Sequence, residues 1–129
     1  FGNPFPNKVS FMSNNPDSYK HLKNNPDYVS VIEQQEKEIN EKSYFFIPKE
    51  NIAEYEHLLK EGDIIGLTTS INGLDVAHVG VLVEQDGKLH LLHASQSKLK
   101  VEISDEPISS FLKPESKNTG IMIARPVEI

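Results

Sequence analysis

DIIGLTTSINGLDVAHVGVLVEQDGKLHLLHAS, at residues 63–95, contains three short apolar runs separated by turn signals, which predicts three consecutive β-strands. Asn72-Gly73 marks the first turn and Asp86-Gly87 the second. The second dipeptide lies between two apolar runs and is a strong signal for a β-hairpin. This part of the chain is therefore expected to form an antiparallel meander, with strands at 63–69, 78–84 and 88–93.

Downstream of the meander, two more strands are expected at 99–103 and 120–125, with a short helix at 107–112 between them. Upstream, helix-start signals dominate. Asn15-Pro16-Asp17 and Asn25-Pro26-Asp27 each place an Asn before a Pro at the first helical position. The Asn side chain is expected to accept a hydrogen bond from an unpaired backbone N–H of the helix.

The second of these helices is expected to end near Lys42 and to be followed by a short extended run at 44–47. Pro48 then opens another helix, and Gly62 is placed to end it as a left-handed cap. Helices followed by an antiparallel sheet indicate an α+β fold. We expect one domain over 1–129, mainly helical or loop at 1–62 and an antiparallel sheet at 63–129.

Composition excludes several classes of protein. The formal net charge of −6 and the absence of a basic cluster argue against nucleic acid as a partner. No apolar run approaches the roughly 20 residues that a membrane-spanning helix needs. Cysteine is absent, which excludes disulfides, thiolate zinc sites and a thiol nucleophile within these 129 residues. The abrupt start at Phe1, without Met or a signal stretch, suggests a piece cut from a longer protein.

Three histidines, His78, His90 and His93, fall within the hairpin. Because side chains alternate along a strand, His93 and His90 lie on opposite faces of the sheet. Antiparallel pairing puts the start of one strand beside the end of the other, so His78 and His93 can meet at one end. Gly80, two residues after His78, removes a side chain beside the imidazole and would let another segment approach.

Three interpretations of this pair stay open on spacing alone. Each histidine can be a partly buried strand-end residue with its own hydrogen-bond partner. The pair can bind a metal with Asp75 or Asp63, although the spacing matches no standard zinc signature. It can also be catalytic, with one imidazole as general base and the other orienting it.

The remaining polar candidates carry weaker signals. Asp75, Ser95 and Thr69 are the candidate substrate-binding residues, although Thr is common on any strand and Ser95 can simply start a turn. Arg125 can bind a substrate carboxylate, but a surface salt bridge is the commoner outcome.

The segments GDIIGLTT, DVAHVGVLV and KLHLLHAS resemble, in this order, the NlpC-type papain-like cysteine peptidases. More narrowly, the chain is similar to the N-acetylmuramoyl-L-alanine amidase-like branch of that superfamily. This narrower resemblance runs from Val9 to Pro126 and rests on the segments KVSFMSNNPDSY, GLDVAHVG with LLHAS, and TGIMIARP. HVG alone is a weak motif, but these segments in this order are specific.

The resemblance implies a papain-like antiparallel sheet or half-barrel with N-terminal helices, here without the helix that bears the nucleophile. It implies that His78 is the general base and that His93 orients it, with no metal or cofactor. The nucleophile of the family is a Cys on an earlier helix, where the helix dipole and an imidazole lower the thiol pKa. The expected partner is then the missing N-terminal segment of the same protein.

By the same resemblance, the substrate is peptidoglycan fragments and the bond is the amide between N-acetylmuramic acid and L-Ala. A γ-D-glutamyl endopeptidase of the stem peptide and a non-catalytic wall- or partner-binding module are the alternatives. A carbohydrate-cleaving enzyme would need two carboxylates facing across a cleft, and the sequence places no such pair. The expected location is the periplasm or cell surface. The chain alone is expected to be inactive and to expose an apolar face of its sheet.

Overall fold

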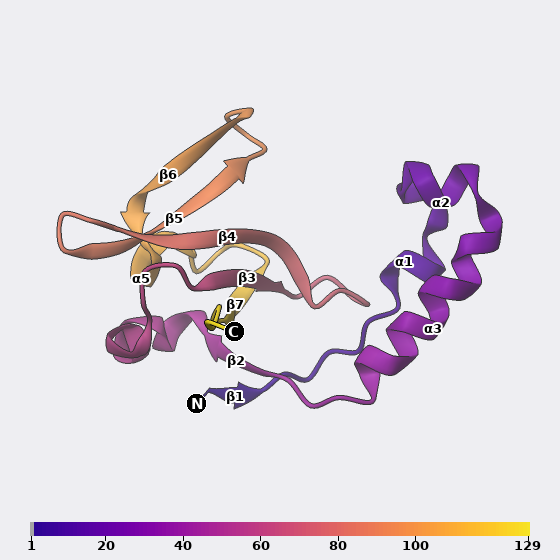
Figure 1. The fold of residues 1–129 in the computed structure, drawn as a ribbon, viewed down its shortest axis with the longest axis horizontal. Coiled ribbons are helices and arrows are strands. Elements are labelled where there is room, and N and C mark those ends of the chain that lie inside the picture. Colours follow the sequence, from indigo (N-terminus) through magenta and orange to yellow (C-terminus); the bar gives the residue numbers. More distant parts are fainter. Residues whose placement is uncertain (1) are drawn as a thin grey trace.

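The computed structural model describes residues 2–129 and shows a mixed α/β fold built on an antiparallel sheet (Figure 1). Seven strands pair in the order β1-β2-β7-β3-β4-β5-β6. Their bounds are β1 Asn3–Pro4, β2 Phe45–Pro48, β3 Ile64–Thr69, β4 Val76–Gln85, β5 Lys88–Ser95, β6 Lys100–Pro107 and β7 Asn118–Ala124. The expected sheet at 63–129 is therefore extended by β1 and β2 from the first part of the chain.

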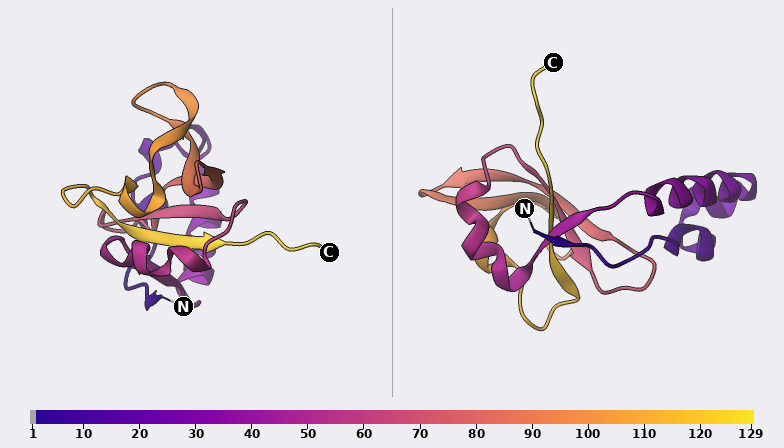
Figure 2. Two further views of the ribbon diagram at one scale, coloured as in Figure 1. Left: turned by 90° about the vertical axis from the view of Figure 1, so that its left-hand side faces the viewer. Right: turned by 90° about the horizontal axis from the view of Figure 1, so that it is seen from below.

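The helices fall into two groups (Figures 1 and 2). An arm that projects from the sheet holds α1 Phe11–Asn14, η1 Pro16–Ser18, α2 Lys20–Asn24, η2 Pro26–Tyr28 and α3 Val29–Asn40. The second group lies against the sheet and consists of η3 Lys49–Asn51, α4 Ile52–Tyr55, η4 Glu56–Leu58 and α5 Ile108–Phe111. None of the helices in residues 2–129 has the length and apolar character to cross a membrane.

The meander expected from 63 onward is present as β3-β4-β5-β6, but β7 returns to pair with the other side of β3. Gly120 makes this return possible, because it lies opposite Pro48 and Thr68 on the two flanking strands. A Cβ atom on Gly120 would lie 2.1 Å from the carbonyl oxygen of Ile47. Only glycine permits β2 and β7 to approach this closely.

The hairpin between β4 and β5 has the two-residue turn that the sequence predicts. Asp86 and Gly87 have φ values of 53° and 75°, so both lie in the left-handed region that a type I′ turn requires. The turn fixes the register, which places Gly80 opposite His93 and Leu82 opposite Leu91. Because register determines which side chains share a face, this turn also determines where the histidines lie.

The hydrophobic core lies between one face of the sheet and the second helix group. The sheet contributes the buried side chains of Ile65, Leu82 and Leu91, and Ile52 of α4 and Ile108 of α5 pack onto them. Full burial of each such side chain stabilises the fold by about 1.5–3 kcal/mol relative to exposure. Removing any one of them would loosen the sheet beneath the histidine pair.

The opposite face of the sheet, here called the open face, is also apolar. Ile64, Val81, Leu92 and Ile103 are register partners on four adjacent strands, so their side chains form one row. Ile64 and Ile103 are exposed, as are Val79 and Val101 from the neighbouring row. The exposed apolar face expected from the sequence is therefore present on β3 to β6.

Two expectations about helix ends are wrong. The Asn15 and Asn25 side chains accept no N-cap hydrogen bond. Instead, each donates from Nδ2 to the carbonyl oxygen four residues earlier, at 2.9 Å for Phe11 and 2.8 Å for His21. The asparagines therefore close the preceding helix, and the Pro that follows begins a short 3-10 turn.

Gly62 does not cap the helix before it. The η4 turn ends at Leu58, and the next residue, Leu59, is already extended, with φ and ψ of −79° and 152°. Gly62 has the expected left-handed conformation, with φ of 88°, but its N–H donates to the carbonyl oxygen of Leu82 at 2.8 Å. It therefore forms the tight turn that leads into β3.

Candidate active site

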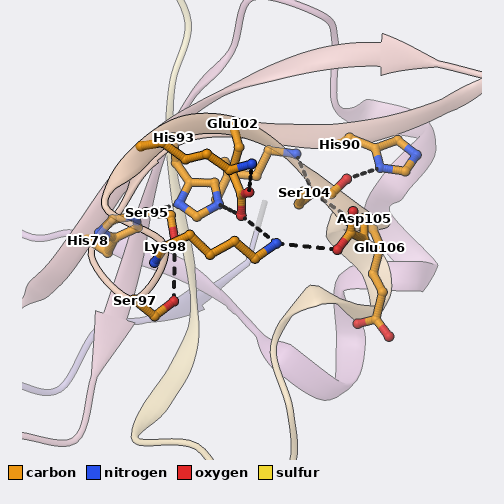
Figure 3. Close-up of polar contacts among 12 residues, drawn as sticks. His78, His90, His93, Ser95, Ser97, Lys98, Glu102, Ser104, Asp105 and Glu106 are labelled. Atoms are coloured by element: carbon orange, nitrogen blue, oxygen red, sulfur yellow. Dashed lines mark hydrogen bonds and ion pairs between the residues drawn. The ribbon is translucent and has the colours of Figure 1, made fainter.

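His78 and His93 form the centre of the candidate site (Figure 3). His78 Nε2 lies 2.9 Å from His93 Nδ1, within hydrogen-bond range. The two rings meet edge to face, with centroids 5.1 Å apart and planes at 83°. The hairpin register produces this contact, because Gly80 opposes His93 and His78 lies two residues before Gly80 on the same face. The expectation that these two histidines meet is confirmed.

The protein holds His93 more tightly than His78. The side chain of His93 is only 8% exposed, and its ring packs edge to face on Phe111 of α5, with centroids 5.5 Å apart. His78 is half-buried and lines an open cleft of about 340 Å³ together with His93, Ser95 and Phe111. The arrangement suits a fixed inner imidazole that orients an outer one beside a cleft.

The surroundings of His78 favour its neutral form. Burial lowers the pKa of His78 below its ordinary value of 6.5, and the neighbouring His93 lowers the pKa further because two adjacent imidazolium charges would repel. At neutral pH His78 therefore holds a free lone pair. Its Nε2 is directed at His93, which leaves Nδ1 as the nitrogen that can take a proton from a reactant.

Glu102 of β6 extends the pair to a third side chain. Its Oε1 lies 3.9 Å from His93 Nε2, so Figure 3 shows His93 between His78 and Glu102. Sequence analysis missed this residue. A signal for it is present, since Glu102 alternates with the apolar residues Val101 and Ile103 along the strand. Its proximity to His93 depends on how β5 pairs with β6, which no local pattern contains.

Comparison with known families gives this site a context. Residues 5–121 match the family described as AmiA-like, N-acetylmuramoyl-L-alanine amidase-like. The chain belongs to this family. No curated protein matches it.

Solved structures from two Bacteroides species are similar to this amidase-like chain. One, from Bacteroides uniformis ATCC 8492, is described as an N-acetylmuramoyl-L-alanine amidase; it shares 38% identity with a TM-score of 0.84, over 94% of this chain and 52% of that one. A structure from Bacteroides fragilis, provisionally described as a xylanase, also has 38% identity and a TM-score of 0.84, over 95% of this chain and 54% of that one. The chain thus spans about half the length of these relatives.

Ser95 is the one candidate substrate-binding residue that the structure brings to the histidines. It lines the same cleft and is itself buried. Its Oγ lies 3.3 Å from Ser97 Oγ and accepts a hydrogen bond from the Lys98 backbone N–H at 3.3 Å. Ser95 therefore also stabilises the turn into β6, and its contact with substrate stays a prediction.

Thr69 is the last residue of β3, and Asp75 lies in the connection between β3 and β4; neither is among the residues that line the histidine cleft. Thr69 Oγ1 accepts a hydrogen bond from the Ile71 backbone at 3.2 Å, and Asp75 Oδ1 accepts one from the Val76 backbone at 2.7 Å. The Thr69 N–H also donates to the carbonyl oxygen of Asp75 at 3.2 Å. The structure thus gives both side chains local roles in shaping a turn.

Asp63 does not contribute to a site with the histidines. Its carboxylate is 1% exposed and accepts two hydrogen bonds from Arg125, at 2.7 Å from Nε and 2.8 Å from Nη2. Arg125 holds the pKa of Asp63 below its ordinary value. Arg125 is therefore engaged in an internal ion pair, and among residues 2–129 no group of three His, Asp or Glu side chains is arranged to hold a metal.

His90 has a separate environment on the other face of β5. It is buried and donates a hydrogen bond from Nδ1 to the carbonyl oxygen of Ser104 at 2.8 Å. The alternation of side chains separated it from His93 as expected. This contact joins β5 to β6 where the strand register shifts, which is a structural role.

Proposed function

We propose that this chain supplies the general base and its orienting residue to an amidase that cleaves the bond between N-acetylmuramic acid and L-Ala in peptidoglycan. The observation that carries the proposal is the 2.9 Å contact between His78 Nε2 and His93 Nδ1 beside an open cleft. Membership of the amidase-like family supports the substrate class. Such a substrate lies outside the cytoplasmic membrane, so we place the protein in the periplasm or at the cell surface.

The proposed mechanism uses a cysteine thiol as nucleophile. Because these 129 residues contain no Cys, the thiol would come from a part of the protein outside them. His78 takes the thiol proton, and the thiolate attacks the lactyl carbonyl carbon of the muramic acid. The resulting imidazolium protonates the departing L-Ala nitrogen, which leaves a thioester. His78 then takes a proton from water, hydroxide attack on the thioester releases the acid, and the imidazolium returns the proton to the departing thiolate.

The electrostatics of the pair fit this sequence of proton transfers. A general base must be unprotonated before the reaction, and the lowered pKa of His78 meets this requirement at neutral pH. His93 limits rotation of the His78 ring through the Nε2 contact. Phe111 in turn packs on the ring of His93. The base therefore faces the cleft in one orientation, as proton transfer from a positioned thiol requires.

The test uses a defined disaccharide-peptide muropeptide with mass spectrometry of the products. The 129-residue chain alone is expected to leave it intact, whereas a protein that joins this chain to the cysteine-bearing segment should release the sugar and the stem peptide beginning at L-Ala. His78→Ala should abolish this release. His21→Ala, an exposed histidine on α2, is the matched control and should not change it.

Each other result points to a different activity. Cleavage by the chain alone would refute the thiol mechanism, because no Cys is present. Products cut after γ-D-Glu would identify a stem-peptide endopeptidase. Binding without cleavage by the longer protein would identify a wall-binding module. Release of xylose units from xylan would instead support the description given to the Bacteroides fragilis structure.

A further inference from the structure

The second ring nitrogen of His93 has no hydrogen-bond partner within residues 2–129. His93 Nε2 is buried, and it is the only buried side-chain nitrogen or oxygen of the described residues left without one. An unsatisfied buried polar atom destabilises the fold, so native structures rarely contain one without a reason. Glu102 Oε1 lies 3.9 Å from this nitrogen. Shortening the distance by about 1 Å would give a normal charge-assisted hydrogen bond.

Glu102 is held in a position that suits this bond. It is the direct register partner of His93 on β6, so the two side chains share one face of the sheet. Its side chain is only 14% exposed although it is an acid. Lys98 Nζ contacts Oε1 at 3.0 Å and Lys100 Nζ contacts Oε2 at 3.9 Å, which keeps the charge compensated. The carboxylate is thus directed at the histidine pair by its strand and by its lysine partners.

We propose that Glu102 is a positioning residue that holds His93 in the tautomer protonated at Nε2. An ionised carboxylate only accepts hydrogen bonds, so the nitrogen that faces it must carry a proton. The Nδ1 of His93 is then left with a lone pair, directed at His78 Nε2 at 2.9 Å. His78 must in turn be protonated at Nε2, and its Nδ1 becomes the basic nitrogen.

The opposite tautomer would defeat the arrangement. His93 protonated at Nδ1 would donate to His78 Nε2 and would direct the lone pair of its own Nε2 at the carboxylate. Two acceptors would then face each other in a buried site, which is unfavourable. His78 would carry its proton on Nδ1, the nitrogen that has to accept one from the reactant.

The catalytic consequence of this inference rests on the proposed function. When His78 becomes an imidazolium, the chain from His78 through His93 ends on the Glu102 charge, which stabilises the new positive charge without moving further protons. Glu102 acts through His93 and is not itself expected to touch substrate. The tautomer of His93 is a property of the folded chain and can be measured without any substrate.

The test records long-range proton–nitrogen correlation spectra of the ¹⁵N-labelled 129-residue chain, which report the tautomer of each histidine. His93 is expected to be protonated at Nε2 in the native protein. Glu102→Met, similar in size but uncharged and only a weak hydrogen-bond acceptor, should move a measurable fraction of His93 to the Nδ1-protonated form. Glu102→Gln retains an amide oxygen and should preserve the native tautomer.

Asp105→Asn is the matched control. Asp105 lies on the same strand and contacts the same lysine, Lys98, at 3.4 Å, but its side chain is 90% exposed. Its loss removes the same charge and should leave His93 unchanged. A native His93 protonated at Nδ1 would overturn the proposal even if no variant folded, and so would an unchanged tautomer in folded Glu102→Met.

A kinetic measurement separates this inference from the proposed function. In a protein that cleaves muropeptides, Glu102→Met should lower kcat by about tenfold or more with little change in KM, whereas Asp105→Asn should change neither. An unchanged kcat in Glu102→Met would overturn the positioning role. If no muropeptide is cleaved, the amidase proposal fails, while the tautomer result still decides whether Glu102 orients His93.

Discussion

Gly80 lies directly opposite His93 in the β4–β5 hairpin, and the space that its missing side chain leaves is already filled. A Cβ atom on Gly80 would lie 2.6 Å from Leu91 Cδ1 and 2.8 Å from the carbonyl oxygen of Leu92. The sequence suggested that this glycine lets another segment approach the imidazole. The segment that comes close is the neighbouring strand β5, whose Leu91 side chain uses the space. Gly80 thus lets the hairpin pack tightly beneath the two histidines.

Gly80→Ala is expected to lower the free energy of unfolding by about 1–3 kcal/mol, because the added methyl group must displace Leu91 or the backbone of β5. Urea unfolding measures the change. Gly66→Ala on β3 is the control, since its Cβ would meet only side-chain atoms of Val76, with the two γ carbons at 2.9 and 3.2 Å, and no backbone atom. An equal or smaller loss for Gly80→Ala than for Gly66→Ala would contradict the argument.

The lowered pKa of His78 predicts a pH dependence of stability. Burial and His93 hold the folded-state pKa of His78 below 6.5, so between these two values the unfolded chain binds more protons than the folded chain. The contribution of His78 therefore destabilises the fold as pH falls below about 6.5 and reaches its full effect below the folded-state pKa.

His78→Gln should remove this contribution, so that unfolding free energies of the variant decline less between neutral pH and about pH 5 than those of the native chain. Urea unfolding at several pH values in this interval makes the comparison. His21→Gln, at an exposed position on α2, should follow the native profile. Parallel profiles for the native chain and His78→Gln would show that the folded state does not disfavour protonated His78.

The pair formed by Asp63 and Arg125 predicts an asymmetry between two variants. Arg125→Gln strands a carboxylate that is 1% exposed, whereas Asp63→Asn leaves an arginine that still reaches solvent. Arg125→Gln should therefore destabilise the fold more than Asp63→Asn at pH 7. Denaturant unfolding of both variants at one pH tests the order.

Lowering the pH should reduce the difference in unfolding free energy between the native chain and Arg125→Gln. Arg125 lowers the pKa of Asp63 below 3.8, so its stabilising contribution is present at neutral pH and is lost as pH falls through the folded-state value. In Arg125→Gln the carboxyl group becomes neutral at higher pH and no longer leaves a buried charge. A difference between native chain and variant that stays constant down to about pH 3 would contradict this account.

How much of the fold the sequence predicts depends on how local the signal is. Asp86-Gly87 and the apolar alternation on either side give the hairpin and its register, so the meeting of His78 with His93 follows from short-range chemistry. The insertion of β7 between β2 and β3 depends on pairings between residues that are 72–74 positions apart for β2 and 49–60 apart for β3, and no local pattern contains them. The sequence therefore predicts the meander but not the order of the whole sheet.

The residues of the candidate site also differ in how local their sequence signals are. His78 and His93 carry signals within one hairpin, whereas Glu102 becomes part of the site only through the β5–β6 register. Thr69 and Asp75 were proposed from residue type alone. Their oxygens instead accept local backbone hydrogen bonds, a use of short polar side chains that often competes with ligand binding. A prediction from residue type alone, made without knowing the strand register, therefore names too many binding residues.

The open face of the sheet predicts that the 129-residue chain associates with itself as its concentration rises. Val101 is 70% and Ile103 41% exposed there, and Ile103 continues the row formed by Leu92 and Val81. Burying one such side chain at a contact stabilises association by about 1.5–3 kcal/mol. Ile103→Lys should therefore weaken self-association by about tenfold or more.

Sedimentation velocity over a range of protein concentrations measures this effect. Leu99→Lys is the matched control. Leu99 is 90% exposed and precedes β6 with φ of 53°. The substitution therefore adds the same charge outside the strands that form the row. It should leave association nearly unchanged. A chain that stays monomeric at high concentration would refute the prediction. An equal effect of the two lysines would show that added charge, and not loss of the apolar row, keeps the molecules apart.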